Sequence, residues 1–579
     1  MAKSREYNFS RVILTLFVCL VPILGSTLDE KAVIYTSFCV LAAAWGFNVY
    51  KTGFFAFTKT AAFFSIVTAY SYFQLIWVSD KGSQAAFATL MLTCTVAAMV
   101  ARQFREFMGD EIHRYGCTLV YIAALCYAVT AVFFQIFVQS KFWGCNMDMG
   151  NNSPTAAAFI MLAGIFAALR LFHEKRKTPA FFAALVLMAY VFVMTKSLGA
   201  FLCGAILIFV YTMNIRHKRV EAFCALVASG VLAVANIIYI VYTFIVGNVS
   251  FDATLRALPG MIGMGKGGYE AFISVVDGGY KGVQLVIDTF GEVYGVFGIL
   301  LAIIVITKAV IKANKDHSMR NMFALIAVGV LMFTSSQSLV FMLPLFAMYY
   351  GFEDDGEYVK AHPLVGALTL VPISFFVMLT AARCFYAFGQ DAFDRGKYAQ
   401  AADWYTTAAR MEIFNSEGWQ KAYNALYKDY TENGTDNLLK QEECLTNASK
   451  HNKANYKYKR LIANVYTNEK RYNDALMVWD EIILKHDKEY LYPMYAQKIC
   501  DVMKYEKNTL DRTSQLYNKI EAYAKKCTNM DIKIKVNNIL TESQKYYVLA
   551  REGDYSEADM YTFDPHGLNE PPTDTGEDI

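Results

Sequence analysis

Apolar segments separated by short polar loops make up the first two thirds of the chain. Each segment can cross the ~30 Å hydrocarbon core of a bilayer as a helix that rises ~1.5 Å per residue. The pattern therefore predicts an all-α fold that begins with a polytopic helical membrane bundle. The segments cover residues 11–28, 31–49, 54–78, 84–101, 116–138, 154–172, 179–196, 198–215, 221–246, 283–311, 322–352 and 363–386.

The run over residues 322–352 is too long for one comfortable helix and has a polar centre from Thr334 to Ser338. Division at that centre gives about 13 spans, whereas one tilted helix gives about 12. The count decides on which side of the membrane the rest of the chain lies. We favour the division, because a polar break in such a run is typical of a turn. It predicts that the C-terminal region lies outside the cytoplasm.

Basic residues gather in alternate loops of the membrane region. Because Lys and Arg are enriched in cytoplasmic loops, these loops and the N-terminus are predicted to be cytoplasmic. The long loop over residues 247–282 then faces outward. The basic loops contain Arg102, Arg105 and Arg114; His173, Lys175, Arg176 and Lys177; Arg216, Lys218 and Arg219; and Lys312, Lys315 and Arg320.

Beyond about residue 387, charged and aromatic residues alternate with helical period, and a weak repeat of about 34 residues appears. Small residues at fixed positions allow two antiparallel helices to approach closely, and aromatic residues fill the space between helix pairs. The spacing predicts a tetratricopeptide-like α-solenoid, with a third, degenerate helical region over residues 510–550. The repeated positions are Gly389, Gly396, Tyr398, Ala401, Tyr405 and Ala408, then Ala463, Tyr466, Tyr472, Ala475 and Trp479.

Three regions follow from these patterns. Residues 1–387 are predicted to form the transmembrane domain, and residues 388–550 the helical repeat domain. Residues 551–579 are acidic, contain Pro and Gly and have few apolar side chains, so we expect disorder there.

Composition narrows the function classes. The net charge of +3 predicts no polyanionic partner, so nucleic acid is not expected. Most of the 12 cysteines lie in apolar runs, and no Cys/His cluster has the spacing of a metal site. We therefore predict neither a metal nor another cofactor.

The outward loop 247–282 and the start of the next span carry the most chemistry. Glycine-rich backbone allows a phosphate to approach N–H groups, and nearby cations can bind a diphosphate. Two carboxylates four residues apart share one face of the entering helix, where acidic side chains are costly and often functional. Two tyrosines could stack on sugar rings or anchor at the membrane interface. The predicted substrate-binding residues are Arg256, Lys266, Lys281, Lys196, Tyr269 and Tyr280, and the predicted catalytic residues are Asp288 and Glu292.

Structural interpretations of the same residues stay open. The glycine run from Gly263 to Gly268 also suits tight packing of helix ends, and Asp288 and Glu292 could pair with Lys281 or Lys196. The glycine run does not match a P-loop, because it lacks the GK[ST] ending and no strand precedes it.

The order of several motifs resembles the O-antigen ligase and O-antigen polymerase superfamily of bacterial envelope glycan enzymes. The resemblance extends over nearly the whole membrane part, and members with a tetratricopeptide tail are familiar. The matching segments are Ile76–Asp80, Gly144–Pro154, Thr195–Ala200, Pro259–Gly265, and Glu292 with Gly295 and Gly298.

The resemblance implies a metal-independent glycosyltransferase in the bacterial cytoplasmic (inner) membrane. Such an enzyme transfers a glycan from a polyprenyl-diphosphate donor to a glycan or surface acceptor on the outer face. Membrane lipid would surround it, and the repeat domain would bind protein partners. Two departures concern the family's usual catalytic residues: Leu198 stands where arginine is usual, and Val283-Gln284 stand where a His-Asn pair is common.

Three alternatives remain at this point. The outer loop also resembles, more distantly, the cell-shape and division polymerases that build peptidoglycan, although their aspartate would fall near Gln284, one helical turn before Asp288. A non-enzymatic scaffold would agree with the missing arginine and histidine. A lipid-glycan transporter is the third, but the early spans carry little charge and show no internal repeat.

Overall fold

The computed structural model describes residues 30–78, 80–108, 111–137, 179–194, 356–452, 456–506 and 508–552, together with single positions at 160–171, 294 and 343–354. The chain divides into two compact units, Met1–Cys384 and Phe385–Ile579. The described residues are predominantly helical, which confirms the all-α class.

In the first unit the described elements are mostly long apolar helices. α3 begins at its N-cap Thr58, whose side chain accepts a hydrogen bond from the Ala61 N–H. α4 extends beyond the apolar segment predicted at 84–101. The elements are α2 (Glu30–Thr52), α3 (Lys59–Phe73), the 3-10 turn η1 (Gln74–Ile76), α4 (Lys81–Met108), α5 (Glu111–Phe137), α7 (Pro179–Met194), α16 (Pro363–Leu368) and α17 (Leu370–Asp394), whose last residues belong to the second unit.

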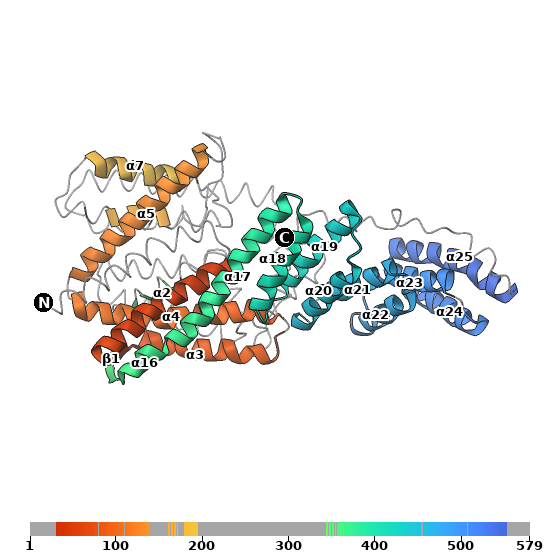
Figure 1. Ribbon diagram of the computed structural model, residues 1–579, viewed down its shortest axis with the longest axis horizontal. Coiled ribbons are helices and arrows are strands. Elements are labelled where there is room, and N and C mark those ends of the chain that lie inside the picture. Colours follow the sequence, from red (N-terminus) through yellow and green to blue (C-terminus); the bar gives the residue numbers. More distant parts are fainter. Residues whose placement is uncertain are drawn as a thin grey trace. The chain divides into compact units, whose positions relative to one another are not determined.

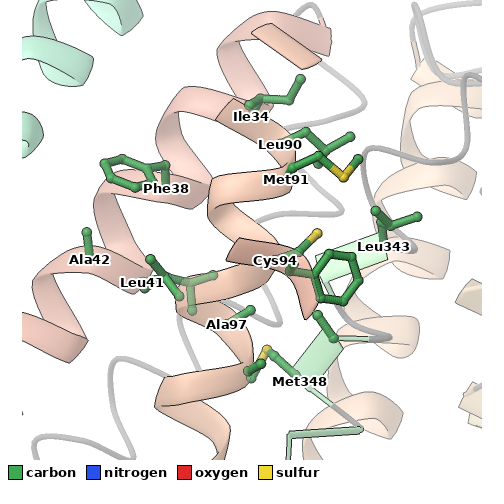
Figure 2. Packing of buried hydrophobic residues seen from close by; sticks show 14 of the residues in the cluster. Ile34, Phe38, Leu41, Ala42, Leu90, Met91, Cys94, Ala97, Leu343 and Met348 are labelled. Carbon is green, nitrogen blue, oxygen red and sulfur yellow. The ribbon is translucent and has the colours of Figure 1, made fainter. Parts of the chain in front are cut away.

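α2 and α4 form the centre of the largest apolar core of this unit. Figure 2 shows Phe38 and Leu41 of α2 beside Met91 and Cys94 of α4, with Leu343 approaching from a distant part of the chain. Leu41 and Cys94 are completely buried. Burial of apolar area at about 25 cal/mol per Å² is what holds such helices together in water, whereas in lipid close packing has to do so.

Other faces of the same helices expose large apolar side chains. Ile66 of α3 is 72% exposed and Val186 of α7 is 70% exposed. Three helices among the described residues are long and apolar enough to cross a membrane, at Lys31–Thr52, Lys81–Arg105 and Pro363–Asp394, and two shorter apolar helices lie at Thr118–Phe133 and Pro179–Val193. Exposed apolar surface on this scale is expected of a chain surrounded by lipid.

A two-stranded antiparallel sheet joins parts of this unit that are far apart in sequence. β1 (Phe54–Phe57) pairs with β2 (Glu357–Lys360), with Phe54 opposite Lys360 and Phe57 opposite Glu357. The Ala361 N–H donates to the Gly53 carbonyl at 2.8 Å and continues the pairing. The expectation that a helical span begins at residue 54 is wrong, because β1 uses the first four residues and α3 begins only at Lys59.

Near the sheet, α2 and α16 pack with their backbones in close approach. A Cβ at Gly366 would lie 2.4 Å from the Gly46 carbonyl oxygen and 2.5 Å from the Tyr50 nitrogen. Farther along, Phe376 of α17 packs on Phe38 with ring centroids 4.5 Å apart. The chain from α16 into α17 therefore runs antiparallel to α2.

The second unit is a succession of amphipathic helices. Figure 1 shows α18 to α25 following one another in chain order, and neighbouring helices pack on each other. They are α18 (Tyr398–Met411), α19 (Glu417–Asn433), α20 (Leu438–His451), α21 (Tyr456–Asn468), α22 (Tyr472–Lys485), the 3-10 turn η3 (Glu489–Leu491), α23 (Tyr492–Tyr505), α24 (Leu510–Lys526) and α25 (Met530–Glu552).

Several repeated positions lie in the core of this unit. Ala463 of α21 is fully buried, and Ala475 and Trp479 of α22 are 1% exposed. A Cβ at Gly389 would lie 2.7 Å from the Tyr405 ring, so glycine permits the aromatic contact there. At Gly389 and Tyr405 a small and an aromatic position of the predicted repeat are therefore in contact.

The structure also contains a helix pair that the sequence repeat did not indicate. α19 and α20 pack on each other between the two predicted repeat units. The predicted boundary at residues 387 and 388 lies inside α17, and the acidic tail beyond residue 552 lies outside the described residues.

Candidate functional site

All eight predicted site residues lie outside the described part of the chain. These are Arg256, Lys266, Lys281, Lys196, Tyr269, Tyr280, Asp288 and Glu292. The described position nearest to the candidate carboxylates is Tyr294, two residues after Glu292. The contacts of Tyr294 are therefore the structural surroundings closest in sequence to the candidate carboxylates.

Tyr294 belongs to a buried polar cluster at one end of the helix pair formed by α3 and α4. Its hydroxyl lies 2.8 Å from the Ser71 Oγ, and its ring is 6.0 Å from the rings of Tyr70 and Phe87. Ser71 is fully buried and Tyr294 is 4% exposed. A residue 223 positions away along the chain is thus held against α3 by a hydrogen bond and aromatic packing.

Two glutamines extend this cluster from α3 to α4. Gln84 Nε2 donates to the Ser71 carbonyl at 2.8 Å and to Gln74 Oε1 at 3.0 Å. Both glutamine side chains are completely buried. A buried amide without partners costs about 1–3 kcal/mol, so these hydrogen bonds are what make glutamine tolerable at this position.

The connection between the two helices sets the glutamines opposite each other. η1 follows α3 directly, and the Val78 N–H donates to the Gln74 carbonyl at 3.0 Å. Asp80 Oδ1 accepts from the Gly82 and Ser83 N–H groups at 3.0 and 3.3 Å. Asp80 thereby satisfies backbone donors at the start of α4, as an N-terminal carboxylate commonly does. Its sequence segment, Ile76–Asp80, therefore has a clear structural role.

Threonines continue the polar strip between α3 and α4. Thr68 and Thr95 lie 3.4 Å apart through their hydroxyls, and Tyr72 and Thr89 lie 3.3 Å apart. Each threonine hydroxyl also reaches the carbonyl four residues earlier in its own helix. Hydroxyls satisfied in this way can line a helix interface within lipid. Both helices are consequently fixed in rotation about their axes.

The side chains of the cluster suit a structural role better than a catalytic one. Its side chains are hydroxyls and amides that carry no charge at neutral pH. Among the described residues, no group of His, Cys, Asp and Glu has the arrangement of a metal site. The cluster can hold a neighbouring helix in one orientation, and any acid, base or diphosphate-binding cation has to come from elsewhere.

The sequence contained a signal for this cluster that the prediction overlooked. Ser71, Gln74 and Gln84 are polar residues within or beside apolar segments. Amides at such depth are uncommon and usually face protein. Tyr294 had no comparable signal, because tyrosine is frequent at membrane interfaces.

Charged groups of the second unit pair with one another across neighbouring helices. Lys519 Nζ of α24 lies 2.7 Å from Asp480 Oδ1 of α22, and Tyr495 of α23 donates to the same carboxylate. The pKa of Tyr495 is raised by burial and by this carboxylate. Lysine and tyrosine donors at Asp480 thus connect three helices, which is a structural use of charge.

Glu481 of α22 has two cationic neighbours. Lys459 of α21 and Lys485 of α22 both form ion pairs with it. Hydrogen bonds from these ammonium groups lower the pKa of Glu481 to about 2. A carboxylate held ionised by two lysines is a weak candidate for acid–base catalysis near neutral pH.

Comparison of the chain with protein-family models, curated proteins and solved structures finds no match.

Proposed function

We propose that this protein is a membrane glycosyltransferase of the O-antigen ligase and polymerase type. In this proposal it transfers a polyprenyl-diphosphate-linked glycan to a glycan or surface acceptor at the outer face of the bacterial cytoplasmic membrane. Arg256, Lys266 and Lys281 bind the diphosphate with help from Lys196. Asp288, or else Glu292, accepts the proton of the attacking hydroxyl.

The observation that carries this proposal is the contact between Tyr294 and Ser71. Tyr294 lies within the Glu292-x-x-Gly295 segment, and Ser71 lies on the helix that leads into Ile76–Asp80. A residue of one segment on which the family resemblance rests therefore contacts the helix that leads into another such segment. Segments that build one site have to meet in this way, although more than 200 residues separate them.

The chemistry required of such a site agrees with the residue types in the outer loop. Cleavage of the bond between sugar and diphosphate leaves negative charge on phosphate oxygens, which Arg and Lys stabilise. The attacking hydroxyl loses a proton that a carboxylate can accept. Tyr269 and Tyr280 supply flat apolar surface for sugar rings.

The two-stranded sheet supports an even number of crossings between its strands. β1 and β2 are hydrogen-bonded neighbours, so residues 54–57 and 357–360 lie at the same face of the membrane. A chain that leaves one face and returns to it crosses an even number of times. Eight segments are predicted between the strands besides the run 322–352, so an even total requires that run to cross twice. With the two segments before β1 and the one after β2, the chain then has 13 spans.

Contacts of the second half of that run agree with this count. A Cβ at Gly351 would lie 2.4 Å from the Ala98 carbonyl oxygen, and one at Gly356 would lie 3.3 Å from the Arg102 Cγ. Gly351 and Gly356 therefore lie at successive positions along α4, in the direction of the sheet. That direction is the one expected if the polar centre at Thr334–Ser338 is a turn.

Charge at the sheet supports a cytoplasmic position for it. Lys51, Lys59, Arg102, Arg105 and Lys360 all lie at this end of the helices, as the positive-inside tendency predicts for a cytoplasmic face. The stretch that follows, Pro363–Asp394, is long enough to reach the other face. The helices that follow α17 then belong outside the cytoplasm, on the side where the glycan is transferred. We propose that these helices form a tetratricopeptide-like solenoid that binds other envelope-synthesis proteins.

The enzymatic proposal is tested by the profile of surface and lipid-linked glycans in cells with and without the gene. Loss of long or attached glycan, with short lipid-linked units outside the cytoplasm, is the expected result. The variants Arg256→Ala and Lys266→Ala should reproduce that loss at normal protein level. Arg395→Ala and Lys525→Ala serve as controls, because both side chains are exposed and lie outside the predicted site.

Two outcomes would contradict the enzymatic proposal. Units trapped inside the cytoplasm would indicate transport, and an unchanged profile would indicate a scaffold. The topology is tested separately by protease digestion of spheroplasts and of inverted vesicles. Digestion of the helical repeats in spheroplasts is expected, and their protection there would contradict the cytoplasmic position proposed for the sheet.

A further inference from the structure

The sheet of β1 and β2 has to lie at the boundary between lipid and water. β1 begins two residues after α2 ends, and β2 ends three residues before α16 begins. α2 and the stretch Pro363–Asp394 are candidate membrane spans. A two-stranded sheet has an open edge on each side, and unpaired backbone N–H and C=O groups are not tolerated in hydrocarbon. The sheet therefore needs water or lipid headgroups around it.

Three lysines surround this sheet without ion-pair partners among the described residues. Lys360 lies opposite Phe54 in the strand register, Lys51 lies in the last turn of α2, and Lys59 begins α3. All three side chains are exposed. Glu357 is separated from Lys360 by three positions in β2 and thus points to the opposite face of the sheet.

A fourth cation lies beneath the sheet at the end of α4. The Arg102 guanidinium is 5.8 Å from the centre of the Tyr358 ring. Its Nε is buried without a hydrogen-bond partner in the described residues. The nearby carboxylate of Asp354 is engaged elsewhere, because it accepts from the Thr60 N–H at 2.7 Å and from the Thr60 hydroxyl at 2.8 Å. Asp354 and Glu357 keep their negative charges, so at the described part of the sheet four cations stand against two carboxylates, an excess of positive charge.

Aromatic side chains stand beside these cations. Tyr50 is 54% exposed, Phe54 and Tyr358 are each 41% exposed, and Phe57 is 39% exposed. Rings at this depth favour the headgroup region, where one part contacts acyl chains and another contacts water. Lysines extend their ammonium groups outward from such a layer to the level of the phosphates.

We propose that β1, β2 and the adjoining helix ends form a binding surface for anionic phospholipid headgroups. Lys51, Lys59 and Lys360 bind the phosphates, and the exposed rings enter the layer just below them. Charge complementarity favours anionic over zwitterionic lipid, because basic clusters next to spans attract anionic leaflets. The inference does not depend on the enzymatic proposal.

The test uses the full-length protein in a neutral detergent, with its thermal midpoint measured as lipid is added. Phosphatidylglycerol should raise the midpoint of the wild type by several degrees, and phosphatidylcholine should raise it less. The variant Lys51→Gln/Lys59→Gln/Lys360→Gln should lose at least half of the difference between the two lipids. High salt should weaken the phosphatidylglycerol effect in the wild type, because exposed charges are screened.

The matched control removes three positive charges elsewhere. Lys440, Lys535 and Lys545 are exposed on helices of the second unit, and their triple glutamine variant should keep the wild-type response. The single variants Lys59→Gln and Lys360→Gln provide the same comparison with less disturbance, each losing about a third of the effect if the three contributions are equal. A full response in the Lys51/Lys59/Lys360 variant, or equal responses to both lipids in the wild type, would overturn the proposal. An equal response to inorganic phosphate alone would identify a soluble anion as the ligand and overturn it also.

Discussion

The two units of this chain differ in the polar side chains that they bury and in the kind of side chain that they expose. Between α3 and α4 of the first unit the buried residues include Ser71, Gln74 and Gln84, while Ile66 on the outer face is 72% exposed. In the second unit the core contains Trp479 and other large aromatics. Its surface carries lysine, arginine and glutamate in ion pairs.

The proposed surroundings, lipid for the first unit and water for the second, account for this difference. Lipid accepts apolar surface without penalty, so helices in a bilayer gain by burying hydroxyls, amides and small residues where backbones can approach. Water rejects apolar surface, so helices of the second unit gain by burying the largest rings. The same helical geometry thus produces two kinds of interface.

The largest effect should come from the core of the second unit. Trp479→Ala removes an indole that is 1% exposed, and such truncations cost about 3–5 kcal/mol. The thermal midpoint of the aqueous helices, followed by circular dichroism of the full-length protein, should fall sharply. Leu484→Ala on the same helix is the control, since Leu484 is 84% exposed and its loss should be nearly neutral.

Close backbone packing in the first unit should be the next most sensitive feature. Gly366→Ala puts a Cβ about 2.4 Å from the Gly46 carbonyl, and such overpacking costs about 1–3 kcal/mol. The midpoint of the membrane helices in detergent should decrease. Ala367→Val, at the neighbouring exposed position, should leave that midpoint unchanged. Equal effects of the two variants would contradict the close approach of α2 and α16.

The polar cluster should show a smaller, coupled effect. Gln84→Leu leaves Gln74 Oε1 and the Ser71 carbonyl without this donor, at a cost of about 0.6–2 kcal/mol in a bilayer setting. The double variant Gln74→Leu/Gln84→Leu should cost less than the sum of the single changes. Strict additivity in this double-mutant cycle would show that the two amides do not interact.

Surface ion pairs of the second unit should matter less. Arg471 contacts Glu442, Glu469 and Asp474 and lies over the Tyr466 ring at 4.1 Å, but it is 41% exposed. Arg471→Gln should therefore lower stability by at most about 1 kcal/mol, and the loss should shrink in high salt. A salt-independent loss would indicate packing as its cause.

The smallest effect should be the pH dependence of Glu481. Its folded pKa of about 2 is below the ordinary value of 4.5, so the ion pairs with Lys459 and Lys485 stabilise the folded state fully above pH 4.5. This stabilisation disappears as pH falls toward 2. The midpoint difference between wild type and Glu481→Gln should be positive at pH 6 and smaller at pH 3. An unchanged difference would contradict the lowered pKa.

Local sequence pattern was enough for many of the helices. The apolar segment at 84–101 predicted the centre of α4, and the spacing of Ala463, Ala475 and Trp479 predicted their burial. Helix formation and the burial of one helix face depend on residues three or four positions apart, so the spacing of apolar residues predicts them directly. α19 and α20 escaped detection because their buried positions depart from the repeat, with Asp429 and Gln441 among them. The predicted loop site itself remains a prediction.

What the sequence by itself determined was the helical class, the position of several helices and the change near residue 387 from long apolar segments to amphipathic ones. The tertiary structure alone decided that β1 pairs with β2 and that Tyr294 contacts Ser71. Each of these contacts joins residues more than 200 positions apart, and no local period encodes such a pairing. It arises because backbone donors at a span end and hydroxyls in lipid must each find a partner, and only the folded chain brings that partner within reach.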